Sequence, residues 1–198
     1  MLKHVTQVSN TTNKRLGPTQ HPLQNAWMFW YNKVNRSHAY EADLVKIHVA
    51  KTVEEFWAVF SVLKHPNDLS FMAEVSMFKM GIDPKWEDPV NFNGGRWVFE
   101  LDAYSQDHDD LYQLLLLTII SDSLGPLNDL ITGVSSSNRR RRIRISIWLQ
   151  IVDERVIEIG KRLKNALGSK TEWYFETFES ARSRDQTRGR GVEKKHII

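Results

Sequence analysis

The stretch Gly81-Ile82-Asp83-Pro84-Lys85-Trp86-Glu87-Asp88-Pro89, followed closely by Gly94-Gly95-Arg96-Trp97, joins two segments with the pattern of β-strands, 71–80 and 95–102. Two prolines and a glycine predict a stiff loop, because proline fixes φ and glycine permits turns that other residues resist. The loop therefore holds Trp86 and Glu87 side by side. An indole can cover the face of a purine, while an acceptor-only carboxylate takes hydrogen bonds from the ring N–H and the amino group. The alternative is that Trp86 is a core residue at a strand end and that Glu87 is a solvated turn residue.

The composition indicates a single domain in a reducing compartment. The chain has 198 residues, of which 41% are hydrophobic, and this suffices for one full-sized core. We expect a flexible polar arm over 1–20 and one domain over 21–198. The chain contains no cysteine, which excludes disulfides and thiolate zinc sites. The longest apolar run, 114–120, is too short to span a bilayer, and 1–20 lacks the apolar core of a signal peptide, so we expect a cytoplasmic protein without a membrane partner.

A block of basic residues stands out from a nearly balanced chain. The net charge is +3, yet positions 139–142 and 144 are all arginine. Such a local block favours a small polyanionic ligand over a long track along a duplex, so we expect no DNA partner. The alternative is a solvated loop or a localisation signal.

Alternating and continuous apolar patterns predict about eight strands. They lie at 27–34, 44–49, 71–80, 95–102, 143–148 and 173–178, with a short edge strand at 197–198, while 130–134 leads into a polar turn at 135–138 before the arginines. In 143–148, isoleucines alternate with Arg144, Ser146 and Trp148, so one face of that strand carries both an arginine and a tryptophan.

Three amphipathic helices are predicted between the strands. Thr52 followed by Glu55 forms a capping box at the start of the first. Trp57 lies at the edge of its apolar stripe, either as an exposed anchor for a partner or as a wider part of the core face. The second covers 111–124 and the third covers 156–167.

The remaining segments favour plain structural roles. The acidic run 107–110 is typical of a helix start rather than a metal site, because acidic side chains favour the positive end of the helix dipole. Segment 180–191 is expected to be a charged loop. The predicted fold class is therefore α+β, a curved antiparallel β-sheet of about eight strands backed by three α-helices on the convex face.

Trp86-Glu87-Asp88 together with Gly94-Gly95-Arg96-Trp97 resembles the eukaryotic translation initiation factor 4E family, the proteins that bind the 5′ cap of messenger RNA. Four further stretches agree in order and spacing. They are His21-Pro22-Leu23-Gln24-Asn25-Ala26-Trp27, Thr52-Val53-Glu54-Glu55-Phe56-Trp57, Ile145-Ser146-Ile147-Trp148 and Ile159-Gly160. The match runs from His21 through nearly the whole chain, and several motifs in one order are more specific than any single one.

The resemblance implies a site for the 7-methylguanosine cap. Trp86 is one stacking wall, its backbone N–H and the Glu87 carboxylate read the guanine edge, and Trp148 lies near the N7-methyl group. The second wall is usually tryptophan in the family, and the matching residue here is Tyr40. Because a phenol has a smaller face, we expect cap affinity to be weaker by about 0.5 to 1 kcal/mol than in a site with two tryptophans. The residues that match the basic phosphate ligands of the family are Arg139, Arg141 and Arg144.

The family also holds a helical motif from a scaffold factor or a repressor on its dorsal surface. The residues that match this surface are His21, Pro22, Val53 and Trp57. On the second helix, the apolar-then-acidic pair of the family is Gln113-Leu114 here, a departure from the standard scaffold-binding pattern.

The resemblance thus implies a protein that binds capped messenger RNA and recruits the translation initiation machinery through a scaffold partner. A cap-binding repressor or specialised homologue that does not engage the usual scaffold is one alternative. A general single-strand RNA-binding domain is another, since aromatic rings stack on any base and arginines follow phosphates.

Catalysis is not expected from the residue pattern. The sequence has no phosphate-cradling glycine loop and no convincing pair of nucleophile and base, and its seven histidines lack metal-ligand spacing. We therefore expect neither catalytic residues nor a cofactor or metal.

Overall fold

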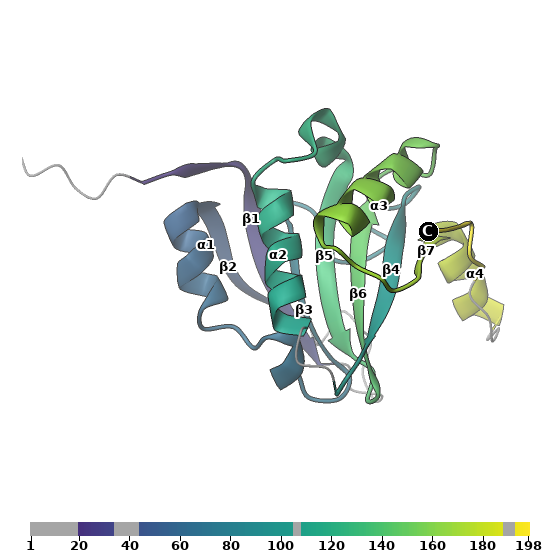
Figure 1. The fold of residues 1–198 in the computed structure, drawn as a ribbon, viewed down its shortest axis with the longest axis horizontal. Coiled ribbons are helices and arrows are strands. Elements are labelled where there is room, and N and C mark those ends of the chain that lie inside the picture. The colour runs from purple at the N-terminus through teal and green to yellow at the C-terminus, as the bar shows by residue number, and fades with distance from the viewer. Residues whose placement is uncertain (1–19, 34–43, 105–107, 188–192) are drawn as a thin grey trace, which may run out of the picture.

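The computed structural model describes residues 20–33, 44–104, 108–187 and 193–198, with the side chains of 185–187 excepted. These residues form an eight-stranded sheet in the order β2-β1-β3-β5-β6-β4-β7-β8, and every neighbouring pair is antiparallel. The predicted curved antiparallel sheet of an α+β protein is confirmed (Figure 1). The strands are β1 (Pro22–Lys33), β2 (Leu44–Thr52), β3 (Ala73–Lys79), β4 (Gly95–Asp102), β5 (Ile131–Asn138), β6 (Arg142–Leu149), β7 (Trp173–Thr177) and β8 (His196–Ile197). The polar turn expected at 135–138 is wrong, because these residues continue β5, where 135–137 pair with both β3 and β6.

The three predicted helices cover one face of the sheet. They are α1 (Val53–Phe60), α2 (His108–Ile120) and α3 (Arg155–Ala166), and Figure 1 shows them on the same side of the strands. At the predicted cap of α1, the N–H of Glu55 donates to Thr52 Oγ1 at 3.2 Å. The Glu55 carboxylate in turn accepts the N–H of Lys51 at 2.7 Å, one residue before the position that a capping box predicts.

The acidic run before α2 starts a helix, as the sequence indicated. Asp109 and Asp110 lie in the first turn, where they favour the positive end of the helix dipole. Asp109 Oδ1 also accepts the N–H of Asn67 at 3.1 Å. The helix begins at His108, three residues earlier than the apolar pattern predicted. None of the helices in the described ranges is long and apolar enough to cross a bilayer.

The main hydrophobic core lies between the sheet and these helices. Trp27 and Phe29 of β1 and Trp97 of β4 are buried in it. The backbone of α3 approaches β4 closely at Gly160, where a Cβ atom would lie 2.5 Å from the indole of Trp97. The indole Nε1 of Trp97 donates to the carbonyl oxygen of Val156 at 2.7 Å. The glycine therefore lets the helix rest directly on the ring.

A fourth helix, α4 (Phe178–Thr187), corrects the expectation of a charged loop over 180–191. The N–H of Ser180 donates to Thr177 Oγ1 at 3.1 Å, which caps the first turn. Phe178 and Ala181 are buried, three positions apart, among charged residues. Two apolar positions give too weak a periodicity to mark the helix in the sequence. Residues 188–192 of the expected loop lie outside the described residues.

The sheet face opposite α1, α2 and α3, called the concave face below, carries three rows of side chains that cross the strands. Directly paired residues on neighbouring strands share a face, so each row follows from the register. The rows are Met28, Phe78, Gly133, Trp148, Arg96 and Glu176; then Trp30, Ser76, Ser135, Ser146, Val98 and Tyr174; then Asn32, Glu74, Ser137, Arg144 and Glu100.

Candidate functional site

The loop 81–94 owes its shape to two buried polar side chains as well as to its prolines. The Asp88 carboxylate accepts the N–H of Asp83 at 2.9 Å. Asn91 Nδ2 donates to the carbonyl oxygens of Asp83 at 3.1 Å and Lys85 at 3.0 Å. Its Oδ1 accepts the hydroxyl of Thr132 at 2.8 Å, which anchors the loop to β5. The backbone at the tip of the loop is therefore held by a connected set of buried hydrogen bonds.

Trp86 and Glu87 lie at this tip. Trp86 is partly buried and Glu87 is exposed, and the indole Nε1 of Trp86 donates to the Glu87 carboxylate. Trp86 combines partial packing with exposed ring surface, so the two interpretations of this residue from the sequence do not exclude each other. It packs against a cluster made of Trp30, Phe78, Trp148 and Phe178.

Trp148 is a central member of that cluster. Its ring centroid lies 5.2 Å from that of Phe78 and 4.5 Å from that of Phe178, and the residue is only 5% exposed. The guanidinium carbon of Arg96 lies 5.8 Å from the Trp148 ring centroid. The indole Nε1 has no hydrogen-bond partner among the residues that the structure describes. The structure thus brings the Trp86 loop and Trp148 together.

The three arginines assigned to phosphates lie farther along the β5–β6 hairpin. Arg144 is four residues from Trp148 on the same face of β6, about 14 Å away for the rise of an antiparallel strand. Arg139 and Arg141 are exposed in the turn beyond. Tyr40, the predicted second stacking wall, lies outside the described residues.

Arg144 is engaged by a carboxylate that the sequence did not lead us to expect. Its Nε and Nη2 donate to Oε1 of Glu100 at 2.9 and 2.7 Å, and Glu100 lies directly opposite on β4. Burial acts to lower the pKa of Arg144, but the hydrogen bond to Glu100 and the nearby charges leave that pKa above its ordinary value. A phosphate that reaches Arg144 therefore also meets the Glu100 carboxylate.

A second carboxylate that the sequence analysis missed is Glu176 on β7. Its side chain is 1% exposed, and its Oε2 accepts Nη2 of Arg96 at 2.9 Å. Arg184 of α4 forms an ion pair with the other carboxylate oxygen. A buried charge requires such partners. Glu176 meets Arg96 only because β4 and β7 are neighbours in the sheet, which no local sequence pattern reveals.

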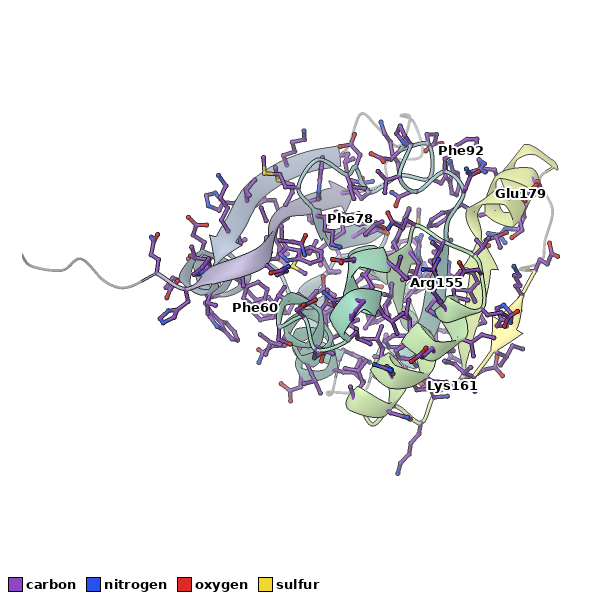
Figure 2. The ribbon with its side chains drawn as sticks, turned by 90° about the horizontal axis from the view of Figure 1, so that it is seen from above. Phe60, Phe78, Phe92, Arg155, Lys161 and Glu179 are labelled. Carbon is purple, nitrogen blue, oxygen red and sulfur yellow. The ribbon has the colours of Figure 1, made fainter. Side chains whose placement is uncertain are left out.

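The helix α4 also holds the loop from the outside. Nη1 of Arg182 donates to the carbonyl oxygens of Phe92 at 2.9 Å and Trp86 at 3.4 Å. The Arg182 guanidinium carbon lies 4.1 Å from the centroid of the Phe92 ring. Figure 2 shows Phe92 beside α4, on the side of the sheet opposite Arg155 and Lys161 of α3. Arg182 thus ties α4 to the loop at two positions, Trp86 and Phe92.

Replacing Arg182 by alanine is expected to loosen the loop without unfolding the protein. Two charge-assisted hydrogen bonds and a ring contact are lost at a partly exposed position, worth about 1 kcal/mol, so amide exchange at Asn91 and Phe92 is expected to accelerate about fivefold. Hydrogen–deuterium exchange with mass spectrometry measures this. Arg155→Ala, which removes an exposed arginine paired with Asp153, is the control and is expected to leave exchange in the loop unchanged. Equal exchange in the two variants would contradict the tether.

A groove on the helical face contains most of the predicted partner residues. It is bounded by β1, α1 and α2, and Pro22, Val53 and Trp57 line it together with Leu114 and Leu117. Trp57 is 40% exposed and Leu114 is 43% exposed. This exposure favours the interpretation of Trp57 as a partner anchor over its interpretation as core.

His21 lies at the edge of this groove. Its ring Nδ1 is 2.7 Å from Oε1 of Glu54, and its backbone N–H donates to Oε2 at 3.1 Å. The side-chain and backbone hydrogen bonds from His21 lower the pKa of Glu54 to about 2. Val53 lines the groove, and Glu54 follows it in the chain. The carboxylate that His21 keeps ionised therefore lies next to the apolar groove.

Fold and site together define an α+β protein with a candidate ligand site on the concave face of its sheet and an apolar groove on its helical face. The chain belongs to the eukaryotic initiation factor 4E family, whose family model matches residues 22–193. It is 32% identical over 178 residues to eukaryotic translation initiation factor 4E-2 of Schizosaccharomyces pombe, which covers 88% of this chain and 72% of that protein. It is 30% identical over 185 residues to eukaryotic translation initiation factor 4E of Candida albicans, which covers 90% and 87%.

Solved structures of the family superimpose on most of the chain. The schistosome eIF4E in complex with m7GpppG and 4E-BP matches with a TM-score of 0.82 and 34% identity over 90% of this chain and 99% of that one. The Caenorhabditis elegans eIF4E-3 in complex with the 4E-binding protein Mextli and a cap analog matches with a TM-score of 0.82 and 27% identity over 91% and 100%.

Proposed function

We propose that this protein binds the 7-methylguanosine 5′ cap of messenger RNA on its concave face. The observation that carries the proposal is the loop tip, where a partly exposed Trp86 and an exposed Glu87 are held next to Trp148 by the buried Asp88 and Asn91. Family membership supports it, because the related schistosome structure is a complex with m7GpppG.

The proposed roles assign one residue type to each part of the cap. Trp86 and Tyr40 stack on the two faces of the base, the Glu87 carboxylate and the Trp86 backbone N–H read the guanine edge, and Trp148 contacts the methyl group. Arg139, Arg141 and Arg144 hold the phosphates.

The expected affinity follows from the chemistry of these parts. Each aromatic face contributes about 2 kcal/mol towards a desolvated cationic base, and the carboxylate contributes about 1.5 to 3 kcal/mol. With the phosphate contacts, the gross sum is on the order of 10 kcal/mol. Association costs about 4 kcal/mol or more of that sum, so a dissociation constant on the order of tens of micromolar is expected.

A titration by intrinsic tryptophan fluorescence tests the proposal. We expect strong quenching by 7-methyl-GDP and roughly tenfold weaker binding of GDP, because the unmethylated base carries no positive charge for the aromatic faces to attract. Equal and weak responses to both nucleotides would contradict a cap site. General single-strand RNA binding would then be the better description, and a steep salt dependence without preference for the methyl group would support it.

We also propose that the groove on the helical face holds a helical motif of a scaffold initiation factor, through which the protein recruits the translation initiation machinery. A repressor that carries a similar motif is the alternative occupant. Support comes from the exposed Trp57 and Leu114 within an apolar lining. The related complexes of the schistosome and Caenorhabditis elegans proteins contain 4E-BP and Mextli, respectively.

Replacing Trp57 by alanine is expected to weaken partner binding about 30-fold, because a central aromatic anchor contributes about 2 kcal/mol or more. Calorimetric titration with fragments of 4E-BP and of Mextli measures the loss. Tyr104→Ala removes a more exposed aromatic ring that does not line the groove and is the matched control. The groove assignment is wrong if Trp57→Ala binds these fragments as tightly as the unchanged protein does.

The protein is further proposed to act by binding rather than catalysis, in the cytoplasm. Membership of an initiation factor family supports binding rather than catalysis. The absence of cysteine supports a reducing compartment such as the cytoplasm. The binding domain is proposed to comprise 21–198, and residues 1–19 of the expected N-terminal arm lie outside the described residues.

A further inference from the structure

The pair of Glu100 and Arg144 occupies the concave face at a position where a ligand could compete for it. Both hydrogen bonds from the guanidinium end on the same carboxylate oxygen, at 2.9 and 2.7 Å. The side chains of Arg144 and Glu100 are 30% and 31% exposed. An ion pair that is partly exposed to solvent is held only weakly, so the Glu100 side chain can turn into water at small cost.

The contrast with Glu176 shows why only one of the two carboxylates is exchangeable. Glu176 is 1% exposed and lies between two arginines, Arg96 and Arg184. Removing it from its partners would leave a buried charge without compensation. Among the described residues, Glu100 forms an ion pair only with Arg144, and its side chain is partly exposed to solvent. Glu176 is therefore structural, and Glu100 is in a position to be displaced.

The position of Arg144 determines which part of a ligand meets this pair. On the concave side of β6, only Ser146 separates Arg144 from Trp148, and the spacing is about 14 Å. A base bound beside Trp148 thus extends its later phosphates, rather than its first, towards Arg144. A phosphate can take the place of the carboxylate because both fit the planar fork of an arginine.

On the basis of the cap binding proposed above, we propose that Glu100 is a specificity-determining residue that limits how much affinity the distal phosphates of a cap contribute. Glu100 occupies Arg144 in the absence of ligand. A nucleotide with one phosphate leaves the pair intact, whereas a longer phosphate chain displaces the carboxylate and then remains close to its negative charge. The affinity of the unchanged protein therefore rises less from the monophosphate to the triphosphate than it would without Glu100.

The test is a phosphate series of 7-methyl-GMP, 7-methyl-GDP and 7-methyl-GTP, titrated against the unchanged chain, Glu100→Gln, Arg144→Gln and the double variant. We expect Glu100→Gln to bind 7-methyl-GMP within about twofold of the unchanged chain and 7-methyl-GTP about fivefold more tightly. The gain is expected to vanish when Arg144→Gln is added, and to shrink at high salt. Glu158→Gln, which removes an exposed carboxylate paired with Arg162 on α3, is the matched control and should leave the series unchanged.

Each outcome decides the proposal. If Glu100→Gln gives the same phosphate series as the unchanged chain, or binds 7-methyl-GTP more weakly, Glu100 orients Arg144 instead of competing for it, and the proposal is overturned. If the gain persists without Arg144, it does not arise from this pair. GTP and GMP titrated in parallel separate this result from the proposed function, because failure of cap binding removes the methyl preference in the unchanged chain, whatever Glu100 does.

Discussion

Replacing Glu87 by glutamine is expected to weaken binding of 7-methyl-GDP about 50-fold while leaving the fold intact. The carboxylate accepts from two donors on the guanine edge and opposes the positive charge of the methylated ring. Loss of a charge-assisted hydrogen bond costs about 1.5 to 3 kcal/mol, and the glutamine amide would in addition turn a donor towards a donor. Glu87 is exposed, and the loop is fixed by Asp88 and Asn91, so the free energy of unfolding is expected to change by less than about 0.5 kcal/mol.

Fluorescence titration and thermal unfolding of the same samples separate the two effects. Glu179→Gln is the control, because Glu179 is an exposed carboxylate on α4, on the same side of the sheet as the loop (Figure 2). We expect it to bind 7-methyl-GDP within about twofold of the unchanged protein, since the distant field of one surface charge is screened by salt. If Glu87→Gln retains its affinity, the carboxylate does not read the base, and the loop serves another purpose.

Features that depend on neighbours in the sequence could be predicted. The prolines and the glycine of the loop, the cap at Thr52 and the alternation in 143–148 each involve residues within a few positions of one another. The structure accordingly has a loop between β3 and β4, a helix that begins after Thr52, and Arg144 on the same face as Trp148. The roles of these residues in binding stay predictions, and Tyr40 lies outside the described residues.

Features that depend on the order of strands could not be predicted in this way. Glu100 meets Arg144 across β4 and β6, and Glu176 meets Arg96 across β7 and β4, although 44 and 80 residues separate the partners. In the sequence, each of these residues is only a polar position in an alternating strand. The interior role of Asn91 is hidden similarly, because its partner Thr132 comes from β5. The electrostatics of the site therefore became visible only with the topology.

Replacing Glu176 by glutamine is expected to lower the free energy of unfolding by about 3 kcal/mol. This is the largest loss of stability that we expect from a single substitution in the site. The carboxylate is 1% exposed and compensates Arg96 and Arg184, which would face each other without it. Breaking a buried ion pair by removing one partner costs about 3 to 5 kcal/mol. We expect the lower end, because the two arginines are 16% and 24% exposed and can be partly hydrated.

For a chain of this size, such a loss corresponds to a fall in Tm of about 6 to 12 °C, which differential scanning calorimetry resolves. Glu158→Gln, which breaks an exposed pair on α3, is expected to change stability by about 0.5 kcal/mol or less. Adding Arg184→Leu to Glu176→Gln removes one of the two uncompensated charges and is expected to recover part of the loss. If instead Glu176→Gln has the same Tm as the Glu158→Gln control, the Glu176 carboxylate does not stabilise the contact between α4 and the sheet. Packing of Phe178 and Ala181 alone then holds the helix in place.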